Sequence, residues 1–435
     1  DRVKAYYIDK YGPDSENVKL CKDGYWFESF VAEKVFESFI EEQPLITVLK
    51  HHQLVSADNL EGRVEAVTVL NRYTQEKLTI KGKVFVDATY EGDLIAATGA
   101  EFRLGRESRD EFGEPHAGHI YNVPGGERIG GTGEGDKRLP AFTFRIPLSS
   151  NPSNQVPLKA PPADYDRTRY LGYFDDLRGG RFGKDLTKIA FTIRKVPSDK
   201  IELNMKPLPL GFVFAEENEG YIEGDWATRE RITAKLRNIS LGLLWFLQHD
   251  PDVSQNAHDT ALKYHPCRDE FTDYDHFPFQ LYVREGRRLV GEFTLSERNI
   301  TEQPGLPSER FHDDAIAMGE FPIDSFPMRK RQPGDTVVLE GYLGMLGKIT
   351  KPYQIPYRIM IPRKVDGLIA PVPASTTHVA FSSVRLEPTW MAMGQAAGTA
   401  AHLAIQKNID LRRVPIKELQ SQLKRQGQVI ELPTK

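Results

Sequence analysis

Apolar and polar positions along the first hundred residues follow two different periods. Between residues 28 and 42, phenylalanine, valine and isoleucine recur near helical spacing, which predicts an amphipathic helix. Residues 63–70 and 77–89 are rich in β-branched side chains and partly alternate, which predicts strands. The apolar run 84–86 is typical of a strand buried on both faces, and a helical stretch is expected to open at 90–93. This order indicates alternating strands and helices.

After residue 105 the composition of the chain changes to that of loops, and later it returns to that of helices and strands. Residues 105–165 are dense in glycine, proline and charge, which predicts long loops. Further helices are expected at 226–248, 279–298 and 389–406, and a short apolar strand at 367–370. The last helix is rich in alanine and glycine, which fits either tight packing against a sheet or a helix whose N-terminus points at a ligand. The predicted fold class is α/β.

Composition removes several classes of protein. The 435 residues include 57 basic and 61 acidic side chains, for a net charge of −4, so no nucleic-acid partner is predicted. There is no run of ~18 apolar residues, so no membrane span is predicted. Cys21 and Cys267 are too few for a disulfide framework or a cysteine-rich metal site. The length predicts two or three domains and favours an enzyme.

The common catalytic motifs do not occur in the sequence. We find no G-x-G-x-x-G, no H-E-x-x-H and no G-x-S-x-G. Residues 344–348 match a phosphate loop only superficially, because Tyr342 and Ile349 stand where the motif requires Gly and Ser or Thr. His116 and His119 lie three residues apart, but no carboxylate–histidine pattern completes a metal site beside them, so no metal is predicted.

His378 is the strongest candidate for chemistry. It is expected in the loop between the strand 367–370 and the helix 389–406, in a cluster of serines and threonines that includes Ser375, with Arg385 close behind. Polar clusters between two buried elements are where α/β folds place ligands. We therefore interpret His378 and Arg385 as catalytic candidates rather than structural caps.

A second group of candidates lies at the start of the expected helix 279–298. His276 stands among aromatic residues, and Tyr282 and Arg284 follow within the predicted helix. These side chains fit a clamp for a substrate anion, and the alternative is a solvated basic helix face.

Two segments of the chain are the most distinctive, VFVDATYEGDLIAATGAEFRLGRES (84–108) and GLIAPVPASTTHVAFSSVRLEPTWMAMGQAAGTAAHLA (367–404). Three more lie between them, DHFPFQLYVREGRRLVGEFTLSE (275–297), DDAIAMGEFPIDS (313–325) and YQIPYRIMIP (353–362). In this order they resemble a family of FAD-dependent oxidoreductases with the glutathione-reductase type of FAD fold. The resemblance covers nearly the whole chain, and its two outer segments are specific.

The resemblance implies FAD as the cofactor and assigns residues to it. The implied contacts are Gln53, Leu54 and Val55 beside the adenine, Asp87, Ala88 and Thr89 at the strand end against the phosphate loop, Ser375, and Gly394, Gln395 and Ala396 in the helix whose N-terminal end faces the flavin pyrimidine oxygens. Such a helix end stabilises negative charge on the reduced ring. No C-x-x-C occurs, so a disulfide relay is excluded, whereas covalent flavin attachment through His378 stays open.

The same resemblance implies a discontinuous Rossmann-like FAD-binding domain with an inserted mixed α+β substrate domain. We place the first part at 1–105, the insertion at 106–364, the last part at 365–410 and a C-terminal tail at 411–435. The family's N-terminal glycine-fingerprint unit is missing, so we interpret the sequence as N-terminally truncated.

The implied function is hydride transfer between a small organic substrate and flavin. One alternative is a non-redox carbohydrate-binding or carbohydrate-active protein on a vestigial flavoprotein scaffold, which the 10% aromatic content permits. Another is a structural fragment without independent activity. The substrate, the electron acceptor, the oligomeric state and the compartment, cytoplasmic or periplasmic, stay open.

Overall fold

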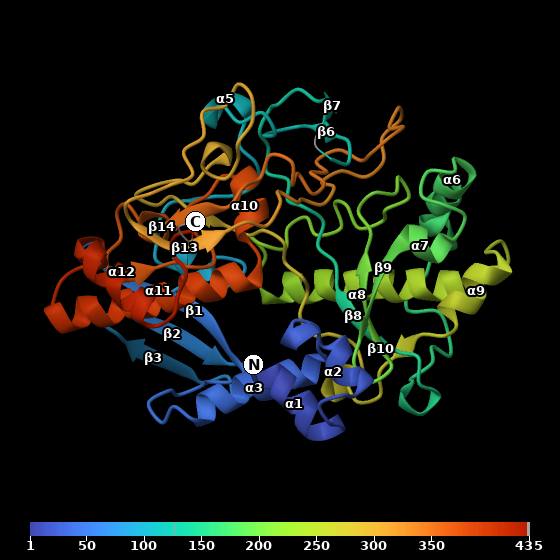
Figure 1. Cartoon of the computed structure of the whole chain (residues 1–435), viewed down its shortest axis with the longest axis horizontal. Coiled ribbons are helices and arrows are strands. Elements are labelled where there is room, and N and C mark those ends of the chain that lie inside the picture. The colour runs from blue at the N-terminus through green and yellow to red at the C-terminus, as the bar shows by residue number, and fades with distance from the viewer. Residues whose placement is uncertain (126, 433–435) are drawn as a thin grey trace. The chain divides into compact units, whose positions relative to one another are not determined.

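The computed structural model describes residues 1–125 and 127–432, and their contacts form two compact units (Figure 1). Unit 1 comprises Asp1–Val48, Phe142–Tyr282 and Lys330–Val337, and unit 2 comprises Leu49–Ala141, Val283–Arg329 and Val338–Lys435. Both units mix helices and strands, as the sequence pattern predicts.

Unit 1 combines short helices, one long helix and a four-stranded antiparallel sheet of order β11-β8-β10-β9. Its helices are α1 (Arg2–Tyr11), α2 (Glu16–Leu20), η1 (Lys22–Gly24), α3 (Ser29–Glu41), η2 (Pro152–Asn154), η3 (Arg167–Tyr170), α6 (Gly172–Arg178), α7 (Leu186–Ala190), α8 (Trp226–His249), α9 (Gln255–Ala261) and η4 (Thr272–Tyr274). Its strands are β8 (Arg145–Ser149), β9 (Phe191–Val196), β10 (Lys200–Met205) and β11 (His265–Pro266). The helices expected at 28–42 and 226–248 are confirmed as α3 and α8.

Unit 2 contains a three-stranded antiparallel sheet of order β1-β2-β3 and four two-stranded pairs. Its strands are β1 (His52–Leu60), β2 (Arg63–Asn71), β3 (Lys77–Lys81), β4 (Phe85–Val86), β5 (Phe102–Arg103), β6 (Tyr121–Asn122), β7 (Arg128–Gly130), β12 (Arg288–Leu289), β13 (Ala315–Gly319), β14 (Tyr353–Pro356) and β15 (Leu368–Ile369). Its helices are α4 (Asp93–Ala97), α5 (Arg109–Phe112), η5 (Glu297–Asn299), η6 (Tyr357–Met360), α10 (His378–Val384), α11 (Glu387–Lys407), η7 (Leu411–Arg413) and α12 (Ile416–Arg425). The expected helix 389–406 is confirmed as α11.

One parallel strand pair joins distant parts of unit 2. Leu368 of β15 pairs with Phe85 of β4, and Ile369 pairs with Val86. Buried apolar side chains behind this pair and along α11 form the core of the unit. The carboxyl ends of both strands therefore lead into the same region, and the chain after β15 continues from there into α10.

The helix expected at 279–298 is wrong. Residues 283–296 are largely extended, with the short strand β12, and their backbone N–H groups donate to distant carbonyls. The N–H of Leu289 donates to Pro373 O (2.8 Å) and the N–H of Leu295 donates to Ser375 O (3.0 Å). These long-range bonds replace the i to i−4 bonds of a helix, so tertiary pairing overrides the local apolar spacing.

Two smaller expectations also need correction. Val86 is 43% exposed, so the short strand β4 is not buried on both faces. The loop expected over 105–165 contains the strand β8, which pairs with β10 on one side and β11 on the other. Partners on both edges stabilise this segment as a strand, and those partners lie more than fifty residues further along the chain.

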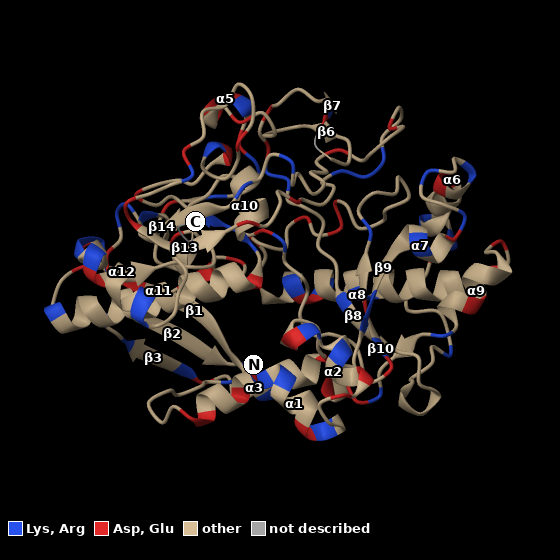
Figure 2. Ribbon diagram, in the orientation of Figure 1, with Lys and Arg blue, Asp and Glu red and all other residues tan. Residues whose placement is uncertain are grey.

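Charged side chains of both signs alternate along the N-terminal helices. Figure 2 shows Lys and Arg interspersed with Asp and Glu on α1 to α3. Among the described residues, no helix combines the length and the apolar character that a membrane crossing requires.

Candidate functional site

The start of α10 places His378 in the interior of unit 2. His378 is the first residue of α10 and is 3% exposed. The expectation that it lies in a loop is therefore wrong, because the loop ends one residue earlier. Thr377 caps the helix, because its side-chain oxygen accepts a hydrogen bond from the N–H of Ala380 (3.2 Å). The Thr377 N–H donates to Leu295 O (2.9 Å), which anchors the cap to the extended segment before η5.

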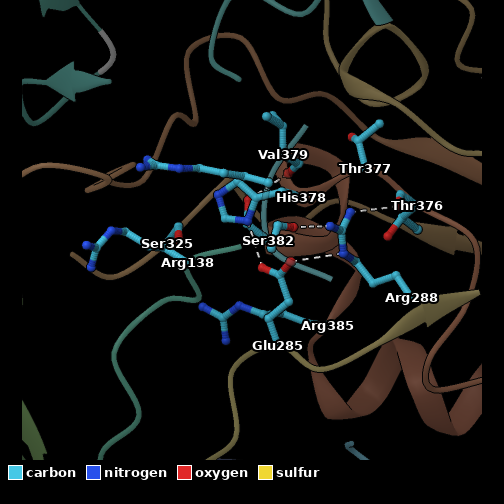
Figure 3. Close-up of polar contacts among 12 residues, drawn as sticks. Arg138, Glu285, Arg288, Ser325, Thr376, Thr377, His378, Val379, Ser382 and Arg385 are labelled. Carbon is cyan, nitrogen blue, oxygen red and sulfur yellow. Dashed lines mark hydrogen bonds and ion pairs between the residues drawn. The ribbon is translucent and has the colours of Figure 1, made fainter. Parts of the chain in front are cut away.

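The His378 ring contacts a buried carboxylate. Its Nδ1 lies 2.7 Å from Oε2 of Glu285, and Oε1 of Glu285 lies 2.9 Å from Nε of Arg288 (Figure 3). A neutral His378 that donates from Nδ1 to Glu285 keeps its Nε2 lone pair as a proton acceptor. The arrangement matches a general base held in one tautomer by a carboxylate, with that carboxylate neutralised by an arginine.

A second glutamate fixes the backbone of the same residue. Oε2 of Glu107 accepts the His378 N–H (2.8 Å), and Oε1 of Glu107 accepts from Nη1 of Arg288 (2.9 Å). Burial by itself would raise the pKa of Glu107, but the charge of Arg288 and the N–H of His378 outweigh it, so the pKa lies below its ordinary value. Arg288 also donates to the carbonyls of Thr376 (2.9 Å) and Gly105. One fully buried guanidinium therefore holds two carboxylates on either side of His378.

Arg385 and Arg284 are also buried in unit 2. Arg385 is the C-cap of α10 and lies seven residues after His378. In an ideal α-helix this spacing puts two positions on the same face, about 10 Å apart along the axis. Its Nη2 donates to the carbonyl of Asp324 (2.9 Å). Nε of Arg284 donates to Ala141 O (3.0 Å), and its guanidinium lies 3.3 Å from the ring centre of Phe326. The structure thus assigns His378, Arg385 and Arg284 to one unit.

The remaining two catalytic candidates belong to unit 1. His276 has a left-handed backbone (φ 59°), its N–H donates to Phe271 O (3.0 Å), and its Nδ1 is a buried atom with no partner among the described residues. The Tyr282 N–H donates to Thr143 O (2.9 Å), and the Arg145 guanidinium lies 5.2 Å from its ring centre.

The residues assigned to the strand ends have local structural partners. Oδ1 of Asp87 accepts from the N–H and the hydroxyl of Thr89 (2.9 and 2.7 Å), and Oδ2 accepts from the Ile95 N–H (2.8 Å). Asp87 therefore holds the turn from β4 to α4, with Ala88 in the middle of that turn. Ser375 is fully buried, and its Oγ lies 3.0 Å from Oγ1 of Thr294.

The other assigned cofactor residues lie on β1 and α11. Gln53 and Leu54 pair with Leu70 and Val69 of β2, and a β-bulge follows at Val55. Gly394, Gln395 and Ala396 follow the start of α11 by two turns, so none is at the helix N-terminus itself. Ala396 is fully buried in the core, whereas Gly394 is exposed and a side chain there would meet no atom within 4 Å.

Two features of unit 2 fit a bound FAD. The exposed backbone at Gly394 and Gly398 of α11 leaves room for close approach of a flat group. Oγ1 of Thr376 and Nε1 of Trp390 are buried without a partner among the described residues. Water or a bound ligand can satisfy such atoms, and FAD carries many acceptors and donors.

Sequence reasoning missed Glu285, Glu107 and the inward role of Arg288. The only signal for these residues in the sequence was the charge-rich run 284–288, which was open to interpretation as a solvated helix face. Glu285 and Glu107 contact His378, and Arg288 contacts both glutamates. These contacts join segments that lie between 88 and 271 residues apart in the chain.

Comparison with known proteins gives a family for the chain. The family described as FAD dependent oxidoreductase matches residues 4–423. No curated protein and no solved structure gives a significant match. The family match leaves the non-redox carbohydrate hypothesis without support. The chain belongs to the FAD dependent oxidoreductase family and is an FAD-dependent redox enzyme.

Proposed function

We propose that the protein oxidises a small organic molecule and that His378 accepts the proton which the substrate loses. The observation that carries this proposal is the buried line from Arg288 through Glu285 to Nδ1 of His378, with contacts of 2.9 and 2.7 Å. It leaves Nε2 as the ring atom that can take a proton from a substrate hydroxyl or amine.

When bound, FAD supplies the two-electron acceptor that takes a hydride from the substrate carbon. The residues around His378 hold the proton acceptor in place for this chemistry. Glu285 orients the ring and stabilises its protonated form, while Glu107 fixes the backbone N–H of the same residue. Arg288 pairs its positive charge with both carboxyl groups inside the protein.

Arg385 is the proposed substrate-orienting residue, because its spacing from His378 puts the two positions on one face of an ideal α-helix. A guanidinium there can bind an electronegative substituent of the substrate through two parallel N–H groups. Arg284, Tyr282 and His276 stay candidates for further substrate contacts.

The proposed FAD-binding domain is discontinuous and Rossmann-like, with parts at 1–105 and 365–410 around a substrate domain at 106–364, and with a tail at 411–435. The parallel pairing of β4 with β15 supports this division, because it joins the first part to the last. The proposed cofactor contacts are the backbone at Gly394, the end of β4 around Asp87 to Thr89, and the segment from Gln53 to Val55.

The test is the anaerobic reduction of the bound flavin, followed by the loss of absorbance at ~450 nm. Primary alcohols, α-hydroxy acids and amines are first screened as reductants with the unsubstituted protein. With the most active compound, His378→Ala should reduce the flavin at least ~10²-fold more slowly. The exposed His249→Ala is the matched control and should keep the normal rate. An unchanged rate in His378→Ala would remove His378 as the proton acceptor.

A further inference from the structure

Another buried glutamate lies next to the cap of α10. Glu114 follows α5 by two residues and is 1% exposed. Its Oε1 accepts from the hydroxyl of Thr377 (2.6 Å) and from the N–H of Glu297 (2.7 Å). Its Oε2 is buried and has no hydrogen-bond partner among the described residues. A carboxylate oxygen without a donor in the interior is costly if it is charged, whereas a protonated oxygen carries no such charge.

The neighbouring Glu297 has the opposite environment. Its Oε1 accepts from Nδ1 of His116 and from Nε2 of Gln303 (both 2.6 Å), and its Oε2 accepts from the N–H of His116 (3.1 Å). Three hydrogen bonds therefore satisfy both oxygens of this carboxyl group. The two glutamates differ in their partners, because one oxygen of Glu114 has none among the described residues.

Several charged or titratable groups surround Glu114. Glu297 and Glu107 both disfavour a negative charge at Glu114, while Arg288 bonds to Glu107 and the His116 ring bonds to Glu297. Burial is the largest influence and the Glu297 charge the second, and together they raise the pKa of Glu114 to about 8, against the hydrogen bonds from Thr377 and the Glu297 N–H.

Glu114 reaches His378 through a single residue. The Thr377 hydroxyl that donates to Glu114 is the same group that caps α10 by accepting the Ala380 N–H, and His378 follows it directly. The carboxyl oxygen thus sets the orientation of the cap hydroxyl at the start of the helix that carries the proton acceptor.

We propose that Glu114 is a neutral carboxylic acid in the working enzyme and acts as a positioning residue, holding the Thr377 cap and through it the backbone of His378. Ionisation of Glu114 places a negative charge in the interior beside Glu297, which destabilises the folded state. Separation of the Glu114 loop from Thr377 removes this destabilisation. The consequence for catalysis rests on the proposed role of His378, whereas the neutrality of Glu114 stands independently of it.

The sign of the pH effect follows from proton linkage. The unfolded chain releases the Glu114 proton near pH ~4.3, whereas the folded protein keeps it up to about pH 8. Between these values the folded state binds one proton more than the unfolded state, so stability decreases as the pH rises. One such proton changes the unfolding equilibrium constant about tenfold per pH unit. Below the lower value and above the upper one, the contribution is constant.

The first experiment is urea unfolding of the purified protein and of Glu114→Gln from pH ~5 to ~9. Gln keeps the neutral shape and the accepting oxygen, so the ratio of the two unfolding constants should change about tenfold per pH unit up to about pH 8 and then level off. Glu111→Gln, on the exposed side of α5, is the matched control and should run parallel to the unsubstituted protein. Parallel curves for Glu114→Gln as well would overturn the proposal.

Infrared difference spectroscopy gives a readout that does not depend on the Gln variant folding. The unsubstituted protein should show a protonated carboxyl C=O band at neutral pH that disappears at alkaline pH. Thr377→Val removes a donor that favours the ionised form, so the band should persist to higher pH in that variant. A band that titrates identically in both proteins, or no band at neutral pH, would overturn the proposal.

The effect of Glu114 on catalysis is measured as the rate of flavin reduction by the most active compound of the reductant screen. Glu114→Ala should slow it at every pH, whereas Glu114→Gln should restore the rate at neutral pH and move the alkaline decline upward. If His378→Ala leaves the rate unchanged while Glu114 still titrates as described, the role of His378 fails and the neutral acid stands. If Glu114 is ionised at neutral pH, the positioning proposal fails whatever His378 does.

Discussion

Glu285 accepts the Nδ1 hydrogen bond of His378 across 93 positions of sequence, at 2.7 Å and with both side chains buried. The bond joins an extended segment to the first residue of α10, and the Glu285 carboxylate is neutralised from its other side by Arg288. An imidazole held in this way has one defined tautomer and one defined orientation, which is what a proton acceptor in catalysis needs.

Glu285→Gln tests that orientation. The amide is neutral and can present N–H instead of oxygen to Nδ1, so the ring loses both its fixed tautomer and the charge that stabilises its protonated form. We expect flavin reduction to slow by at least ~10²-fold while the flavin stays bound. Stopped-flow absorbance measures the rate, and Glu292→Gln, a partly exposed acid paired with Arg412, is the control. A normal rate in Glu285→Gln would show that the ring needs no carboxylate.

Arg288→Met tests the charge balance of the same cluster. The substitution leaves Glu107 and Glu285 buried without their cation, which costs about 3–5 kcal/mol of unfolding free energy. Urea unfolding measures the difference. The control is Arg63→Met, which breaks the half-exposed pair with Asp410 and should cost less than ~1 kcal/mol. Equal losses in the two variants would contradict the assignment of Arg288 as the neutralising group.

A comparable prediction concerns the buried ion pairs of Lys200 in unit 1. Its ammonium is fully buried and lies within 3.0 Å of Glu28, Asp269 and Glu270. Lys200→Met should lower the unfolding free energy by about 3–5 kcal/mol at neutral pH, because three carboxylates lose their common cation.

The deficit of Lys200→Met should shrink as the pH falls towards ~4, since the carboxylates then become neutral. Burial already raises the pKa of Glu270, so this carboxylate is protonated at a higher pH than an ordinary glutamate. Thermal unfolding at several pH values checks the trend, with the exposed Lys4→Met as control. A deficit independent of pH would mean that packing rather than charge accounts for the loss.

The two cysteines should be chemically inert in the folded protein. Cys21 and Cys267 are both fully buried, and burial raises the pKa of the Cys267 thiol. The thiolate is the reactive form, so iodoacetamide should label neither residue at mildly alkaline pH and both residues in urea. Mass spectrometry of the labelled chain counts the adducts. Rapid labelling of the folded protein would show that the N-terminal helices open readily around Cys21.

Local pattern was sufficient for the elements whose stability is local. The helices α3, α8 and α11 were predicted because their apolar side chains recur at helical spacing over three or more turns. The strands β2 and β3 were predicted from β-branched residues that pair with near neighbours in the chain. The helix expected at 279–298 is wrong for the opposite reason, since several backbone N–H groups of this segment bond to carbonyls between 69 and 196 positions away.

The candidate site shows the same division. Residue type and a polar setting were enough to select His378 and Arg385, and the family resemblance was enough to name FAD, which the family match confirms. The buried hydrogen-bond partners of His378 were not accessible in that way. Glu285, Glu107 and Glu114 are ordinary acids in the sequence, and their burial is visible only once their neighbours are in place.

The sequence by itself therefore determined the α/β character and the family, and it selected His378 as a candidate. The tertiary structure decided the hydrogen-bond partner of the His378 Nδ1 and which carboxyl groups lie in the interior. The physical reason is that periodicity reports the environment a residue shares with its near neighbours, whereas a buried charge is set by groups that approach from remote parts of the chain.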